Sequence, residues 1–224
     1  LLRVIEGLAI DTVLDVGANT GQTVVELREL GFSGSIISFE PTQLLFAGLV
    51  ERFASDPAWT GHRIALGDHV GEMTLHRYEM EDMNSFLAPT EFGSQRFRSL
   101  AAPLIADETV PITRLDEVWA DFVPPGRTLL KIDTQGYDLE VIKGAAQSME
   151  SVDAVLTEVP VNHIYDGMPN VVEVFSKMEK LGFQLSGIFP ISRDLAGLRM
   201  IEGNCMFVRT DAFDSEGADY VGRN

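Results

Sequence analysis

The chain has 224 residues, of which 45% are hydrophobic and 23% charged, a composition typical of one globular domain with a sizeable core. Its formal net charge of −17 disfavours nucleic acids and anionic membranes as partners, because both bind positively charged surfaces. The single cysteine, Cys205, excludes an intramolecular disulfide and fits a reducing compartment such as the cytoplasm, and no apolar run is long enough to span a bilayer.

We expect a single domain over residues 1–210, followed by a flexible acidic tail over residues 211–224. Its first unit is a strand, a glycine turn and a helix. Residues 12–16 are apolar or β-branched except for Asp15, which predicts a buried parallel strand. Two glycines follow, and apolar residues then recur at helical spacing up to Gly31, which ends the helix. Ligands of open α/β sheets bind beyond the carboxyl ends of the strands, so this turn is the expected ligand site.

The spacing of this turn distinguishes between nucleotide classes. A dinucleotide fold requires G-x-G-x-x-G, whose third position is here Asn19, and Asp15 would repel a pyrophosphate. The same carboxylate would suit the ammonium and sulfonium groups of S-adenosyl-L-methionine. The pattern Asp-x-Gly-x-Asn-x-Gly resembles the first motif of class I methyltransferases that use this cofactor; the alternative is an ordinary βα turn. The expected cofactor residues of the turn are Asp15, Gly17, Ala18, Asn19, Gly21 and Thr23.

The second and third strands supply further cofactor candidates. Residues 35–40 form an apolar strand that ends in Glu40, which is placed to accept hydrogen bonds from ribose hydroxyls, with Pro41 beside it. Thr42 is expected to cap the following helix. Residues 62–67 predict a third strand. Its exit turn, Gly67 and Asp68, is either an adenine contact or a solvated turn.

The middle of the chain is less regular. Residues 72–78 alternate with period two, which predicts a half-exposed added strand. Residues 83–106 show no clean period and are a candidate lid or substrate loop, in which Asn84 and Ser85 are the polar residues of interest. A strand entering a helix follows, with Thr113 as its cap.

The second half repeats the pattern of apolar strands that end in acids. One strand leads to Asp133 and another to Glu158, and the carboxyl ends of such strands meet at one edge of a sheet. Asn170 with Glu173 forms a capping box for the next helix, and a closing pair of strands covers residues 183–189 and 204–209. The predicted fold is α/β: a doubly wound, mostly parallel seven-stranded sheet with an antiparallel last strand.

Residues 114–117 and 130–145 resemble the FkbM family of methyltransferases, whose signature reads roughly Lys-Ile-Asp-x-Glu-Gly, an acid, and Leu-Lys-Gly-Ala. Gln135 replaces the usual glutamate, and Asp138 stands where glutamate is commoner. The resemblance implies an O-methyltransferase that uses S-adenosyl-L-methionine, yields S-adenosyl-L-homocysteine and acts on a small molecule, saccharide unit or natural product. It also implies that Asp133 lies between the cofactor's methyl group and the acceptor.

A hydroxyl is a poor nucleophile until a base takes its proton. Asp133, Asp138, Glu158 and His163 are the candidate groups, and histidine changes protonation near neutrality, so His163 is the expected base while Asp133 orients the acceptor. Asp133 and Glu158 would also suit Mg²⁺ through water molecules, but no dense carboxylate cluster requires a metal, and none is favoured. The alternatives are a binding module of the same fold without catalysis and, less favoured, a nicotinamide-dependent oxidoreductase. The sequence leaves a homodimer open.

Overall fold

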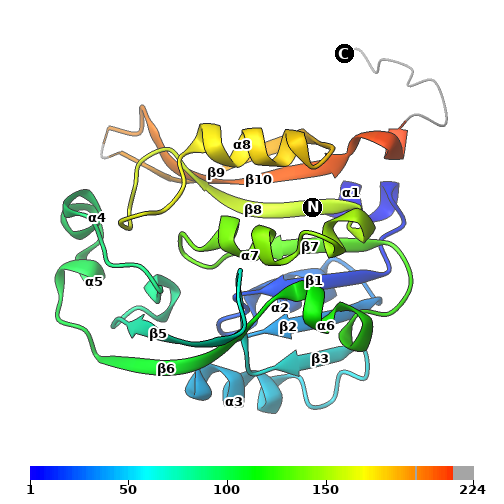
Figure 1. Cartoon of the computed structure of the whole chain (residues 1–224), viewed down its shortest axis with the longest axis horizontal. Coiled ribbons are helices and arrows are strands. Elements are labelled where there is room, and N and C mark those ends of the chain that lie inside the picture. The colour runs from blue at the N-terminus through cyan, green and yellow to red at the C-terminus, as the bar shows by residue number, and fades with distance from the viewer. Residues whose placement is uncertain (195, 214–224) are drawn as a thin grey trace.

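The structure is a computed structural model and describes residues 1–194 and 196–213. It contains a seven-stranded sheet in the order β3-β2-β1-β7-β8-β10-β9 and a three-stranded sheet in the order β4-β6-β5 (Figure 1). The strands of the large sheet are β1 (Thr12–Val16), β2 (Ser35–Phe39), β3 (Trp59–His62), β7 (Thr128–Ile132), β8 (Ala154–Pro160), β9 (Phe183–Arg193) and β10 (Met200–Arg209). Those of the small sheet are β4 (Ala65–Leu66), β5 (Gly71–Arg77) and β6 (Ala106–Thr113).

Strands β3, β2, β1, β7 and β8 pair in parallel, whereas β10 runs antiparallel to both β8 and β9. The prediction of a mostly parallel seven-stranded sheet with an antiparallel last strand is therefore confirmed. The last strand in sequence is not at the edge, because β10 lies between β8 and β9. Both of its edges are paired over most of its length, so most of its backbone N–H and C=O groups find partners within the sheet.

Helices cover both faces of the large sheet. They are α1 (Leu2–Gly7), α2 (Gln22–Glu29) and α3 (Gln43–Arg52) on one face, and α6 (Leu115–Phe122), α7 (Asp138–Gly144) and α8 (Val171–Lys180) on the other. Successive residues of β1 point to opposite faces, so Val13 packs with α2 while Leu14 packs with α6 and α7. Because β1 is buried on both faces, its alternate residues enter the two hydrophobic cores on either side of the sheet.

The predicted third strand over residues 62–67 is wrong in its extent. Strand β3 ends at His62, where the chain leaves the large sheet, and Ala65–Leu66 pairs with β6 in the small sheet. His62 stacks on Phe122 of α6, with 3.7 Å between the ring centroids. The apolar run therefore joins two strands in different sheets, a division that only tertiary pairing decides. The added strand predicted over residues 72–78 is present as β5.

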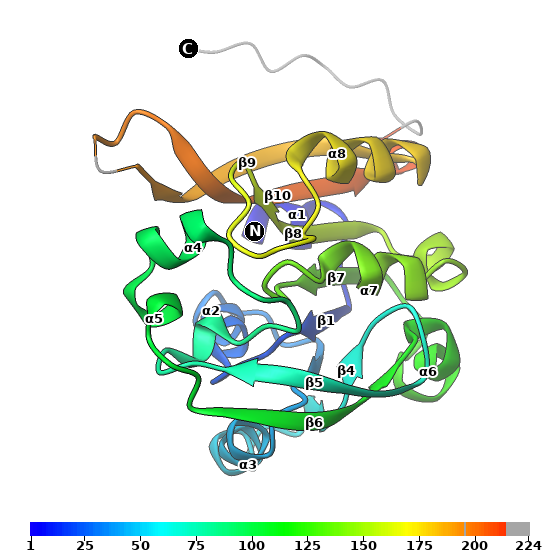
Figure 2. The ribbon, with the colours of Figure 1, turned by 60° about the vertical axis from the view of Figure 1, so that its left-hand side comes forward.

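The segment predicted as irregular contains the short helices α4 (Glu91–Arg96) and α5 (Arg98–Ala101), and η1 (Glu81–Met83) ends at the first residue of that segment. The Thr90 side chain caps α4 by accepting a hydrogen bond from the backbone of Gly93. In Figure 2, α4 lies beside the β9–β10 hairpin, and Arg96 Nη2 donates to the carbonyl oxygen of Arg193 at 3.0 Å. The segment is thereby attached to the large sheet.

Two of the three predicted caps are wrong. The capping box of Asn170 and Glu173 at the start of α8 is present with both of its hydrogen bonds. Thr42 stands at the N-cap of α3 without a capping bond, and α6 has Arg114 rather than Thr113 at its N-cap. The predicted tail beyond residue 213 lies outside the described residues. Among the residues that the structure does describe, no helix has both the length and the apolar character needed to cross a bilayer.

Candidate active site

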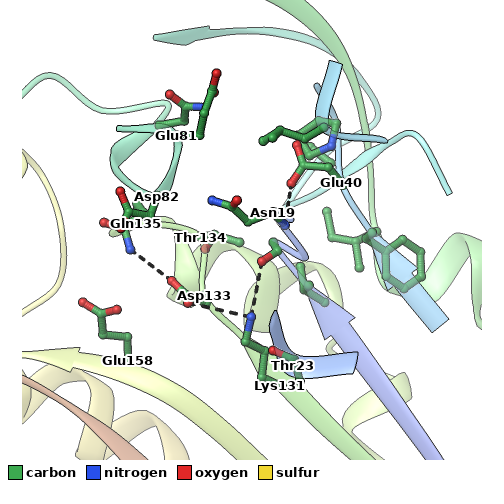
Figure 3. Close-up of a pocket in the computed structure, with 18 of the residues that line it drawn as sticks. Asn19, Thr23, Glu40, Glu81, Asp82, Lys131, Asp133, Thr134, Gln135 and Glu158 are labelled. Carbon is green, nitrogen blue, oxygen red and sulfur yellow. Dashed lines mark hydrogen bonds and ion pairs between the residues drawn. The ribbon is translucent and has the colours of Figure 1, made fainter. Parts of the chain in front are cut away.

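A cavity of about 390 Å³ lies across the carboxyl ends of β1, β2, β7 and β8, within the usual size range of small-molecule sites (Figure 3). The segment from Glu81 to Phe86 and the residues Glu202 and Asn204 of β10 also line it. Parallel strands bring their carboxyl ends to the same edge, which is why residues far apart in the sequence meet here.

Glu40 is held in one orientation at one end of the cavity. Its Oε2 accepts a hydrogen bond from the backbone N–H of Asn19 at 2.9 Å, and its Oε1 accepts from the backbone N–H and the hydroxyl of Thr42 at 2.9 and 2.7 Å. Burial raises the pKa of Glu40 although these hydrogen bonds act in the opposite direction. The Thr42 hydroxyl therefore serves the carboxylate instead of capping α3.

The glycine turn after β1 is packed tightly against the exit of β7. Gly17 has a φ of +77°, and a Cβ there would lie 1.9 Å from the carbonyl oxygen of Asp133. Only glycine allows this approach. The turn thus brings Gly17 and Asn19 to the cavity wall beside Asp133.

Asp15 does not line the cavity, because the Lys131 side chain lies between Asp15 and the cavity. Asp15 is completely buried, and Lys131 Nζ lies 2.9 Å from its Oδ1 and 3.7 Å from Asp133 Oδ2. The amine also donates to the carbonyl oxygen of Gly17 at 3.3 Å. Burial acts to lower the pKa of Lys131, but the carboxylates of Asp15 and Asp133 outweigh it and hold the pKa above its ordinary value. A charged Lys131 is therefore the part of this ion pair that lines the cavity.

Asp133 is oriented by Gln135. The Gln135 amide donates from Nε2 to Asp133 Oδ1 at 3.0 Å, a bond marked in Figure 3. Gln135 has a φ of +51°, a conformation that is uncommon outside glycine, and the buried Ser85 hydroxyl donates to its carbonyl oxygen at 2.7 Å. Where the family signature has a glutamate, this chain has a hydrogen-bond donor to Asp133.

Two carboxyl groups from adjacent strands line the far end of the cavity. Glu158 belongs to β8 and Glu202 to β10, and Glu202 is buried with its Oε1 accepting from the Ser192 hydroxyl at 2.7 Å. Burial raises the pKa of Glu158 well above its ordinary value, and the neighbouring carboxylates of Asp133 and Glu202 raise it further. Sequence reasoning missed Glu202, since its place depends on the antiparallel register of β10 on β8.

The structure brings only part of the predicted set to the cavity. The predicted residues that line it are Gly17, Asn19, Thr23, Glu40, Pro41, Asp133 and Glu158, and those that do not are Asp15, Ala18, Gly21, Gly67, Asp68 and His163. His163 is exposed, and its carbonyl oxygen accepts from the Thr90 hydroxyl at 2.8 Å. Asp68 is paired with His69 at 2.7 Å, and Gly67 is in contact with α7.

Sequence reasoning also missed the apolar wall beside Glu40. Its residues come from the carboxyl end of β2 and from the segments that follow it in the chain: Phe39, Leu45, Ile64, Ala65 and Leu66. They carry no chemical signal in the sequence, because apolar residues of the core and of a ligand pocket are alike in type. Within the described ranges, no three histidine, cysteine, aspartate or glutamate side chains are arranged to hold a metal ion.

The strand order and the position of the cavity define the fold of the class I methyltransferases that use S-adenosyl-L-methionine. The sequence matches the family model of the methyltransferase FkbM domain over residues 15–185, and the chain belongs to this family of methyltransferases. The resemblance drawn from the residues is thereby confirmed.

Individual relatives are distant. Methyltransferase sdnD of Sordaria araneosa is 26% identical over an alignment of 153 residues and matches 59% of this chain and 59% of that protein, so the chain spans less than two thirds of this relative. The crystal structure of WbdD is similar with a TM-score of 0.51 and 14% identity, over 93% of this chain and 37% of that one. Magnesium protoporphyrin IX methyltransferase (ChlM) from Synechocystis PCC 6803, solved with bound S-adenosylmethionine, gives a TM-score of 0.49 at 10% identity over 93% of this chain and 74% of that one. The likeness to WbdD concerns the fold alone.

Proposed function

We propose that the chain transfers a methyl group from S-adenosyl-L-methionine to a hydroxyl of a small-molecule or saccharide acceptor. The observation that carries the proposal is the fixed carboxylate of Glu40 beside the apolar wall. An acid in this position accepts hydrogen bonds from two ribose hydroxyls, and the apolar wall suits an adenine ring. Membership of a methyltransferase family supports the same donor.

This placement orients the rest of the donor. With the nucleoside at Glu40, the methionine part extends along Gly17 toward Lys131, whose ammonium would pair with its carboxylate. The sulfonium then lies near Asp133 at the end of β7. The acceptor would occupy the remaining space, bordered by Asn84 and Glu158.

Methyl transfer to a hydroxyl is an in-line displacement in which alignment supplies much of the rate. The hydroxyl oxygen forms a bond to the methyl carbon, the carbon–sulfur bond breaks, and its electron pair stays on sulfur as S-adenosyl-L-homocysteine. The hydroxyl proton must leave to a base. We assign this role to Glu158, which lines the cavity and whose raised pKa suits a base. Asp133 would orient the hydroxyl, and His163, which does not line the cavity, serves as a comparison residue.

The acceptor end is rich in carboxylates, which disfavours phosphorylated or otherwise anionic acceptors. A neutral polyol or sugar hydroxyl is consistent with the mixture of carboxylate and amide groups there. Radiolabelled S-adenosylmethionine incubated with small-molecule fractions of a lysate tests this directly: label should enter a neutral fraction. Glu158→Gln should abolish the transfer, and His163→Ala should keep it. Label in the anionic fraction only would contradict the assignment.

Donor binding is tested by isothermal titration with S-adenosylhomocysteine. A hydrogen bond to a charged group contributes roughly 1.5–3 kcal/mol, so Glu40→Gln should weaken binding about tenfold or more. Glu29→Gln is the matched control, because Glu29 is exposed at the end of α2, and it should bind as the unaltered chain does. Equal affinity for all three proteins would contradict the assignment of Glu40.

Two rival functions give different results in the same assays. A binding module without catalysis would retain the cofactor tightly but transfer no label to any fraction. A nicotinamide-dependent enzyme would bind NAD in place of S-adenosylhomocysteine. The turn argues against it, because Asn19 occupies a glycine position of the dinucleotide pattern.

A further inference from the structure

Glu158 and Glu202 form a carboxyl pair at the far end of the cavity. In the antiparallel ladder of β8 and β10, Glu158 lies opposite Asn204 and Glu202 opposite Pro160, so the two glutamates are diagonal neighbours. Both line the cavity. The Ser192 hydroxyl holds one oxygen of Glu202 at 2.7 Å, which fixes this carboxyl group beside its neighbour.

Within the part of the chain that the structure describes, no cationic side chain of the cavity wall balances this pair. Among the described residues that line the cavity, Lys131 is the one cationic side chain, and its ammonium lies 2.9 Å from Asp15 and 3.7 Å from Asp133. Two carboxylates that share a partly dry site cannot both ionise at low cost. Before a ligand binds, the stable arrangement of this pair therefore keeps one proton, on Glu158.

The other acidic groups around Glu158 also favour its protonated form. Asp133 faces it from the end of β7, Asp138 from α7 and Glu202 from β10, and all three are acids. Tyr165, from the loop after β8, adds no positive charge, and burial raises the pKa of its phenol above the ordinary value. Burial of Glu158 and the charges of Asp133 and Glu202 together raise the pKa of Glu158.

The donor changes this balance because it carries a positive charge. We propose that the carboxyl pair holds a proton before the donor binds and releases it when the sulfonium of S-adenosyl-L-methionine enters, so that the base is present only with the donor in place. The inference rests on the proposed function, which places the sulfonium near Asp133. An opposite charge at about 4–6 Å favours the ionised form of a carboxyl group.

The protons balance over one cycle. On donor binding an O–H bond of the pair breaks, and the proton passes to solvent. On transfer the acceptor hydroxyl gives its proton to the pair while the carbon–sulfur bond breaks and the sulfur becomes neutral. The product complex then holds the same proton as the pair does before the donor binds, and neutral S-adenosylhomocysteine leaves the pair protonated.

Isothermal titration counts the released protons without any knowledge of the acceptor. Binding heats are measured at one pH near neutrality in phosphate and in Tris, whose ionisation enthalpies differ. S-adenosylmethionine should release up to about one proton, and S-adenosylhomocysteine should release clearly less, since the two ligands differ in the charge on sulfur. Equal release by the two ligands would overturn the inference.

Variants assign the proton to the pair. Glu158→Gln and Glu202→Gln should each abolish the difference between the ligands while S-adenosylhomocysteine still binds, and the exposed Glu29→Gln should keep it. If one variant fails to fold, the other decides. A difference that persists in a folded variant of the pair would overturn the assignment. If the unaltered chain binds neither ligand, the proposed function fails and this inference fails with it.

Discussion

At the scale of single residues, Lys131 decides how Asp15 acts on the site. The two are cross-strand neighbours, because β1 and β7 pair in a register that places Asp15 opposite Lys131. An aspartate before a glycine turn is readable from the sequence, and so is a lysine in an apolar strand. Their pairing is not, since it depends on which strands become neighbours. The sequence therefore indicated the right turn but not the side chain that reaches the cavity.

Removing one partner of this pair should cost much more stability than removing both. Asp15→Asn leaves Lys131 with only the longer contact to Asp133, at 3.7 Å, and breaking a buried pair costs up to about 3–5 kcal/mol. The double variant Asp15→Asn with Lys131→Met should recover a large part of that loss. Urea unfolding measures both.

The same variants separate stability from ligand binding. If Lys131 pairs with the methionine carboxylate, the double variant should stay about tenfold or more weaker for S-adenosylhomocysteine even though it folds well. Full recovery of binding in the double variant would show that Lys131 serves only to neutralise Asp15.

At the scale of elements, most helices and strands could be predicted from period and capping residues. A predicted cap was wrong where another group bound the capping side chain. Thr42 occupies the N-cap of α3, yet its hydroxyl donates to Glu40, whereas Asn170 caps α8 as its pattern predicts. A cap is a local preference of modest energy, so a buried carboxylate that needs a donor can override it.

Truncation of these two N-cap residues should affect different properties: stability at Asn170 and cofactor binding at Thr42. Asn170→Ala should lower the free energy of unfolding by about 1 kcal/mol and leave cofactor affinity unchanged. Thr42→Ala should weaken the binding of S-adenosylhomocysteine, because it removes a donor that orients Glu40. Urea unfolding and isothermal titration of both variants check this. A loss of cofactor affinity in Asn170→Ala, with none in Thr42→Ala, would contradict it.

The contact of α7 with the small sheet depends on a glycine. A Cβ on Gly144 would lie 1.8 Å from the carbonyl oxygen of Gly67, so Gly144→Ala should destabilise the chain by forcing α7 away from this loop. Gly48 of α3 has nothing within 4 Å of the same position, and Gly48→Ala should stabilise by about 0.5–1 kcal/mol. Thermal unfolding of both variants provides the comparison, and equal shifts would contradict the close approach.

At the scale of the whole molecule, buried carboxyl groups decide how stability depends on pH. Burial, aided by the charge of Asp133, raises the pKa of Asp138 to about 6, although the hydroxyls of Thr157 and Thr134 donate to it at 3.0 and 3.1 Å and act to lower it. Burial is also the largest cause of the raised pKa of Glu40 and Glu158. All three groups bind protons more tightly in the folded chain than in the unfolded chain.

The raised pKa of these groups determines how the free energy of unfolding changes with pH. Between the ordinary pKa of 3.8 and the folded value of about 6, folded Asp138 holds a proton that the unfolded chain has lost. The free energy of unfolding therefore falls as the pH rises through this window, by about 3 kcal/mol for Asp138 alone, and stays low above it. The net charge of −17 adds self-repulsion in the same direction.

We therefore expect the chain without ligand to be more stable near pH 5 than near pH 8, and Asp138 to carry a large share of the difference. Asp138→Asn removes the titration while its amide oxygen still accepts from Thr157, so urea unfolding of this variant should show a much flatter dependence on pH. Thr157→Val removes a donor that favours the ionised form, and should extend the fall to higher pH. If Asp138→Asn and the unaltered chain lose the same stability between pH 5 and pH 8, the buried proton on Asp138 is refuted, and the dependence must come from Glu40, Glu158 or the surface charge.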